Sequence, residues 1–225
     1  MDRITSIYKL LQVNLSMQRI IKETESRAIK RAKELFSPQS GMFRVSEAVK
    51  AGVHPRTIYT MRDKGLIARL GRGMYRFSDL PALGNPDLAT VAMKIPTGII
   101  CLISALSYHE ITTEIPHEVY LALPRGAEPP RLDYPPLRIF WFSGTAFEEG
   151  IEHHEVDGIP MKVYNPEKTL ADCFKYRNKI GLDVALDALK FYRQRKRFKA
   201  ADELMHFARI CRVEKVMRPY LEAIL

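Results

Sequence analysis

Apolar and polar positions follow a helical period through the first part of the chain. Between residues 24 and 36, apolar side chains recur on one helical face, which predicts an amphipathic helix. A shorter helix is expected after Ser46, which has the side chain of an N-cap, and a third helix is expected over residues 55–64. Ile58 and Met61 form the apolar face of this third helix, so its remaining side chains are expected to point outward.

The period changes from helical to strand-like after residue 65. Residues 66–70 and 74–77 are short runs typical of strands, and they flank the sequence Gly71-Arg72-Gly73, which predicts a hairpin with a basic tip. Three helices followed by a basic hairpin are the order of a winged helix-turn-helix, in which the third helix enters the major groove of DNA. We therefore predict an arm over residues 1–26 and a winged helix-turn-helix DNA-binding domain over residues 27–80.

The segment between residues 78 and 86 contains two prolines and a glycine and predicts a linker. Beyond it, the patterns predict helices over 87–94 and 99–109, strands over 119–123, 137–142, 150–156 and 159–164, and helices from Asn165 to the end. The C-terminal domain, residues 81–225, is thus expected to be α+β. The predicted fold class is mainly α with an α+β second domain.

Charge is distributed unevenly along the chain. Residues 1–80 contain 16 Lys and Arg against 7 Asp and Glu, a net charge of +9, whereas residues 81–225 contain 19 of each kind. The whole excess therefore coincides with the predicted helix-turn-helix. This distribution favours a polyanion, such as double-stranded DNA, as the partner of the first domain.

Composition narrows the class of protein further. Hydrophobic residues make up 46% of the chain, which excludes a wholly disordered protein. No apolar run approaches the length of a membrane span, and the N-terminus lacks the unbroken apolar centre of a secretory signal. The three cysteines Cys101, Cys173 and Cys211 form neither a metal-ligand pair nor a disulfide framework. We therefore expect a cytoplasmic protein.

A helix offered to the major groove needs basic and hydroxyl side chains for the base edges, and basic side chains nearby for the phosphates. Candidates for the base edges are Arg56, Thr57 and Thr60, and candidates for the phosphates are Arg44, Lys64, Arg69, Arg72 and Arg76. The alternative is that these side chains solvate a small helical domain that binds a protein partner.

Enzyme chemistry finds little support in the sequence. His153 and His154 are adjacent on a predicted strand and point to opposite faces, so they are not expected to bind one metal ion. A magnesium-dependent nuclease remains as an alternative, built on Lys162 and five acidic residues, Glu148, Glu149, Glu152, Glu155 and Asp157. Pro160, however, stands where the second carboxylate of a Glu-x-Lys pair would be. We expect no catalytic residues, metal or cofactor, and therefore no enzyme.

Two blocks of sequence carry a family resemblance. The run that begins Gly41-Met-Phe-Arg-Val-Ser-Glu-Ala and ends Gly-Arg-Gly-Met-Tyr-Arg resembles the N-terminal winged helix of AbiEi-family antitoxins. The stretch Asn165-Pro-Glu-Lys-Thr-Leu-Ala-Asp-Cys-Phe-Lys-Tyr-Arg-Asn-Lys-Ile-Gly-Leu-Asp-Val-Ala-Leu resembles the C-terminal domain of the same family. Residues 1–23 lie outside the resemblance.

The resemblance implies a bacterial antitoxin of a type IV toxin-antitoxin system, of the kind associated with phage defence. In that family the N-terminal domain represses its own operon by binding inverted repeats in the promoter. The C-terminal domain is needed to counteract a nucleotidyltransferase-like AbiEii toxin, without a stable complex. Two readings remain beside this one: a plain winged-helix transcription factor whose second domain senses a ligand, and the nuclease above. The basic run over residues 190–199 is either a further nucleic-acid or toxin contact or a solvated loop.

Overall fold

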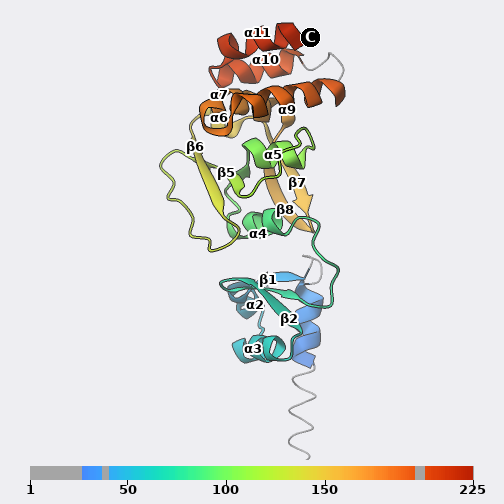
Figure 1. The fold of residues 1–225 in the computed structure, drawn as a ribbon. Coiled ribbons are helices and arrows are strands. Elements are labelled where there is room, and N and C mark those ends of the chain that lie inside the picture. The colour runs from blue at the N-terminus through green and yellow to red at the C-terminus, as the bar shows by residue number, and fades with distance from the viewer. Residues whose placement is uncertain (1–26, 37–40, 196–200, 225) are drawn as a thin grey trace, which may run out of the picture. The chain divides into compact units, whose positions relative to one another are not determined.

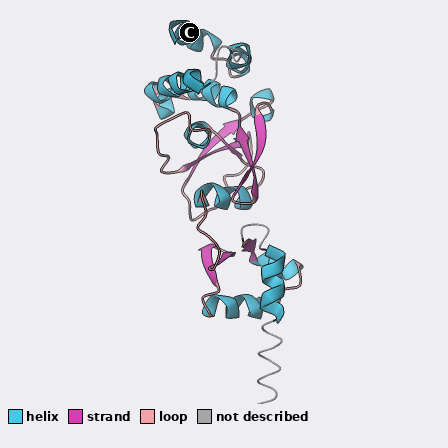
Figure 2. Cartoon of the chain, turned by 90° about the vertical axis from the view of Figure 1, so that its right-hand side faces the viewer, coloured by secondary structure: helices cyan, strands magenta, loops and turns pink. Residues whose placement is uncertain are grey.

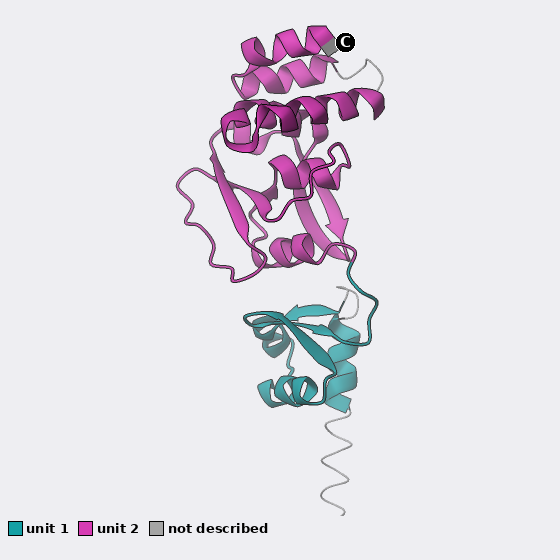
Figure 3. Cartoon of the chain, in the orientation of Figure 1, with its two compact units in different colours: residues 1–83 teal, residues 84–225 magenta. Residues whose placement is uncertain are grey.

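The chain divides into two compact units, residues 1–83 and 84–225 (Figure 3). The computed structural model describes residues 27–36, 41–195 and 201–224 (Figure 1). The predicted arm over residues 1–26 and the basic side chains Lys196, Arg197 and Lys199 lie outside these ranges. Each unit is described by itself below.

Between residues 27 and 83, the described part of the first unit combines three helices with a small antiparallel sheet (Figure 2). Residues 27–36 are helical. The elements that follow are β1 (Met42–Arg44), α2 (Val45–Lys50), α3 (Pro55–Asp63), β2 (Ile67–Gly71) and β3 (Met74–Phe77), with β3 in the centre of the sheet. The third helix and the hairpin are where the sequence predicts them. Strand β1 was not predicted, and it pairs with β3 from Met42 opposite Arg76 to Arg44 opposite Met74.

The core of this unit is formed by one side of each element. Ile58 and Met61 of α3 are buried, as the helical spacing predicts, and they join a cluster that includes Phe36, Phe43 and Phe77. The prediction of Ser46 as an N-cap is wrong, because α2 begins at Val45 and Ser46 is its second residue. Arg44 occupies the N-cap position there, and its backbone N–H donates to the Glu47 carboxylate at 3.3 Å.

The second unit is built on a mixed five-stranded sheet in the order β6-β5-β4-β8-β7. Its strands are β4 (Ile99–Ile100), β5 (Val119–Pro124), β6 (Leu137–Phe142), β7 (Ile151–Val156) and β8 (Ile159–Tyr164). Its helices are α4 (Pro86–Lys94), α5 (Leu102–Tyr108), α6 (Thr145–Glu148), α7 (Pro166–Lys175), α8 (Arg177–Ile180), α9 (Leu182–Arg195), α10 (Ala201–Ile210) and α11 (Glu214–Ile224). The four predicted strands are therefore confirmed, although residues 99–100, predicted as the start of a helix, form β4.

Alternating side chains of the sheet pack on different helices, as the period of two requires. Ile100, Leu121 and Met161 line the space beneath α4. Their neighbours, including Ile99 and Ala122, belong to a cluster with α5, α7 and the C-terminal helices. The sheet lies between α4 and the pair α5 and α7, and α9, α10 and α11 pack on α7. Figure 1 shows α4 at one end of this unit and α10 with α11 at the other.

The prediction of a mainly α chain is wrong. Two sheets, of three and five strands, accompany the helices of the described residues, so the fold is mixed α/β. The sheets organise both cores, and several strands are only two to five residues long. No helix in the described ranges combines the length and the apolar character that crossing a membrane requires.

Candidate nucleic-acid interface

Helix α3 begins at a well-defined cap. The Nδ1 atom of His54 accepts a hydrogen bond from the backbone N–H of Arg56 at 3.1 Å, and Pro55 occupies the first helical position, where no N–H is needed. The buried Ile58 and Met61 hold one side of the helix against the core. The N-cap and the two buried side chains together determine which side of α3 faces solvent.

The outward face of α3 carries some of the predicted base-contacting side chains. With about 100° per residue, Arg56 and Thr60 lie opposite Ile58 and Met61, whereas Thr57 falls at the border of the buried side. Arg56 is exposed, and Thr57 and Thr60 are half-buried. Arg56 and Thr60 are therefore well placed to reach a groove, and Thr57 less so.

The sequence analysis missed Tyr59, which lies on this face, and Arg62, which lies at its border. Tyr59 is 53% exposed, and the guanidinium of Arg62 lies 5.3 Å from the centre of its ring. Arg62 also pairs with Asp63 at 2.8 Å, and this hydrogen bond raises the pKa of Arg62. The pairing offsets the negative charge of Asp63, which would otherwise repel phosphate. Tyr59 lies three positions after Arg56, so helical spacing alone could have identified it.

The hairpin of β2 and β3 presents further basic side chains. Its turn contains Arg72, which is exposed, and Gly73 with a φ of +68°, a conformation that favours glycine. The register of the two strands shifts between Arg69 and Gly71, and the Nε of Arg69 donates to the Gly71 carbonyl at 3.3 Å. The Gly73 carbonyl accepts from the backbone N–H of Val45 at 3.0 Å, which ties the tip to the start of α2.

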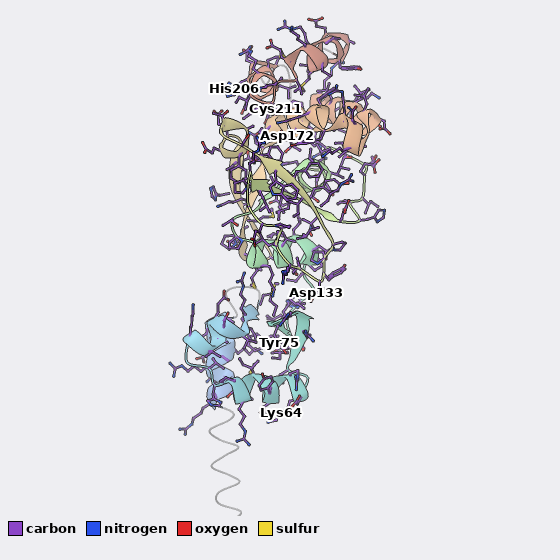
Figure 4. All side chains as sticks on the ribbon, turned by 90° about the vertical axis from the view of Figure 1, so that its left-hand side faces the viewer. Lys64, Tyr75, Asp133, Asp172, His206 and Cys211 are labelled. Atoms are coloured by element: carbon purple, nitrogen blue, oxygen red, sulfur yellow. The ribbon has the colours of Figure 1, made fainter. Side chains whose placement is uncertain are left out.

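The remaining predicted phosphate contacts differ in their surroundings. Lys64 is exposed at the C-terminal end of α3 (Figure 4). Arg44 is half-buried, and its Nε lies 3.7 Å from the Glu47 carboxylate. Arg76 is also half-buried, and its guanidinium donates to the backbone carbonyls of Leu80, at 3.4 Å, and Pro81. Arg44 and Arg76 therefore have contacts within their own unit.

Three of the five acidic residues considered for a nuclease have contacts within the second unit. Glu149 pairs with His206 at 3.0 Å, and Glu152 pairs with His154 at 2.9 Å. Both oxygens of the Asp157 carboxylate accept backbone N–H groups from residues 84 and 85. Within the described ranges, no group of three or more His, Cys, Asp or Glu side chains is arranged to hold a metal ion.

A buried ion pair lies in the second unit. Lys168 and Asp172, four residues apart on α7, are both fully buried and bonded to each other, and the Cys211 thiol donates to Asp172 at 3.2 Å (Figure 4). The Lys168 ammonium also lies 4.1 Å from the centre of the Tyr164 ring. Burial raises the pKa of Asp172, and Lys168 opposes that shift. The group is closed to solvent, so its role is to join α7 to the segment after α10.

A known protein family matches part of the first unit in sequence. Residues 30–78 match the model of the family described as "Transcriptional regulator, AbiEi antitoxin". The match covers the helix over 27–36 from its fourth residue, both further helices and the hairpin, and it does not extend to residues 165–186.

A solved structure shares the fold. The Rv2827c protein from Mycobacterium tuberculosis superposes with a TM-score of 0.50 and 11% sequence identity, over 88% of this chain and 81% of that one. No curated protein matches the chain. Residues 30–78 are thus similar in sequence to the AbiEi antitoxin transcriptional regulator family.

Proposed function

We propose that this protein is a DNA-binding repressor of its own operon and the antitoxin of a toxin-antitoxin pair. One observation carries the DNA-binding part: the unit that holds the chain's whole excess of positive charge presents Arg56 and Thr60 on the outward face of a helix, with Arg69 and Arg72 on an adjacent hairpin. The family match over residues 30–78 supports the same reading.

These side chains would make two kinds of contact with DNA, one to base edges and one to phosphates. Arginine donates two parallel hydrogen bonds to the major-groove edge of guanine, and threonine contacts base edges through its hydroxyl or its methyl group. We assign these contacts to Arg56 and Thr60, with Thr57 at the border. Lys64, Arg69 and Arg72 would bind phosphates, which adds affinity without reading sequence.

The antitoxin part rests on the second unit. Residues 165–186, whose sequence resembles the C-terminal domain of AbiEi antitoxins, form α7, α8 and the start of α9. We propose that this unit counteracts a nucleotidyltransferase-like toxin without catalysing a reaction and without a stable complex with the toxin. The protein would then act on two partners, promoter DNA and the toxin.

A pair of cellular assays tests both parts with one variant. A reporter driven by the DNA upstream of the gene is expected to be repressed by the wild-type chain and released by Arg56→Ala. The neighbouring toxin gene, co-expressed with the chain, is expected to be neutralised equally by the wild type and by Arg56→Ala. Repression without any rescue from the toxin would favour a plain transcription factor, and the absence of both effects would refute the proposal.

A further inference from the structure

The segment between the units is attached to the first unit at its beginning. The Arg76 guanidinium donates to the carbonyls of Leu80 and Pro81, and Lys33 forms an ion pair with Asp79. Arg76 lies on β3, the central strand of the small sheet. Residues 79–81 are therefore held by side chains that belong to the DNA-reading unit.

The same segment is attached to the second unit at its end. Asp157 occupies the turn between β7 and β8, where its Oδ1 accepts the N–H of Gly84 at 2.9 Å and its Oδ2 accepts the N–H of Asn85 at 3.0 Å. Asn85 in turn caps α4 by accepting the N–H of Leu88 at 3.2 Å. Both carboxylate oxygens of Asp157 are thus used to fix the chain where it enters α4.

Between the two attachments lie Ala82 and Leu83. We propose that these two residues are the hinge of the protein, and that Arg76 and Asp157 are positioning residues that keep the hinge short. Each residue contributes two soft backbone dihedrals, so attaching the residues on either side leaves four dihedrals to vary the orientation of the DNA-reading unit. The consequence for DNA rests on the proposed function.

A short hinge matters for an operator made of inverted repeats. If two copies of the chain are joined through their second units, two winged helices engage two half-sites at once, and the second contact becomes more favourable as fewer orientations have to be excluded. Loosening the hinge should therefore weaken binding to an inverted repeat and leave binding to a single half-site unchanged. This also gives Arg76 a role other than the phosphate contact expected from the sequence.

The hinge can be tested in the absence of DNA. Spin labels at Glu34→Cys and Lys215→Cys, one exposed position in each unit, report the distribution of distances between the units, with the labelled chain diluted in unlabelled protein. Asp157→Asn keeps a residue that tolerates the left-handed φ of +50° at this turn but removes one of the two acceptors. We expect the distribution to widen by a factor of about 1.4, because releasing residues 84 and 85 lengthens the flexible segment from two residues to four. Glu155→Gln, an exposed substitution on the same hairpin, is the control and should leave the width unchanged.

A second measurement separates the two roles of Arg76. If Arg76 bound a phosphate, Arg76→Gln would lower the salt slope of DNA binding by about 1, as expected for Arg72→Gln. Under the hinge proposal, Arg76→Gln leaves the slope unchanged and widens the distance distribution, whereas Arg72→Gln does the reverse.

Two results would overturn the proposal. One is an unchanged distance distribution in both Asp157→Asn and Arg76→Gln, each with the melting temperature of the wild type. The other is that these two variants lose affinity equally for inverted repeats and for single half-sites. A wild-type protein that binds no DNA would refute the proposed function, and the distance measurement would still decide whether the hinge exists.

Discussion

At the scale of single residues, helical spacing predicts which way a side chain points but not what it contacts. The spacing from Ile58 and Met61 places Arg56 outward, and the structure agrees. The same reasoning could not show that the Arg76 guanidinium reaches the carbonyls of Leu80 and Pro81, because that contact depends on how the chain leaves the sheet. Arginines of the same basic segment, such as Arg56 and Arg76, therefore differ in what they contact.

The assignment of Arg56 to a base edge predicts a loss of sequence discrimination on truncation. Arg56→Ala should cost about 1–3 kcal/mol on the upstream DNA and much less on a scrambled duplex, because a lost base contact affects only the specific complex. Titrations of both duplexes at one salt concentration measure the difference. Lys64→Ala is the matched control and should weaken both complexes alike. Equal losses for Arg56→Ala on both duplexes would place Arg56 on the phosphates.

His109 predicts a dependence of stability on pH. It lies at the end of α5, with its Nε2 2.8 Å from the Tyr164 carbonyl, and burial lowers its pKa below the ordinary 6.5, although that hydrogen bond and Glu152 act in the opposite direction. Because the folded pKa is the lower one, the unfolded chain binds more protons, and stability falls as the pH drops below 6.5.

Urea unfolding at about pH 7.5 and pH 5.5 measures this effect. The loss of stability between the two conditions should be smaller in His109→Gln than in the wild type, since glutamine can still donate to the carbonyl but does not titrate. His117→Gln, at an exposed histidine, should behave like the wild type. A His109→Gln protein with the full wild-type loss would rule out His109 as the source.

At the scale of elements, long patterned segments were predictable and short ones were not. Strand β6 and the Asn165-capped helix α7 lie where the sequence places them, because alternation and caps are local signals. Residues 99–100 extend an apolar run that continues into α5, and only pairing with β5 and β8 makes them a strand. Strand β1, three residues long, likewise depends on its partner β3.

Gly150 is predicted to be required where β7 begins. Its φ is +77°, and an added Cβ would lie 2.7 Å from the Cβ of Lys168 and 3.1 Å from the Cε1 of Phe207. Gly126 has a φ of +90° and open space, so it is a matched control. Gly126→Ala should cost about 1–2 kcal/mol for the left-handed backbone alone. Gly150→Ala should cost a further ~1–3 kcal/mol for overpacking. Equal costs in thermal unfolding would mean that the close approach of α7 is unimportant.

The Lys168–Asp172 pair predicts an asymmetry between single and double variants. Lys168→Met leaves a buried carboxylate without its cation and should cost about 3–5 kcal/mol, whereas Lys168→Met combined with Asp172→Leu should recover most of that loss. Denaturant unfolding of the wild type and the two variants measures the difference. Additive losses in the double variant would show that the two side chains act independently.

At the scale of the whole molecule, charge predicted more about function than about fold. The concentration of the +9 excess in residues 1–80 falls on the unit that matches the AbiEi family. The fold class was misjudged as mainly α because the sheets are made of short strands between longer helices, and sheet order depends on contacts far apart in sequence. The residues that would carry the proposed antitoxin action were not predictable, since the sequence analysis found no motif of recognisable chemistry between residues 84 and 225.

DNA binding is the central claim, and fluorescence anisotropy tests it most directly. The labelled duplex upstream of the gene and a scrambled duplex of the same composition would be titrated with the full chain at low and at high salt. We predict tighter binding to the upstream duplex, with an affinity that falls as salt rises because basic side chains displace counterions from phosphates. Equally weak binding to both duplexes would contradict the account, because the basic unit would then not read sequence.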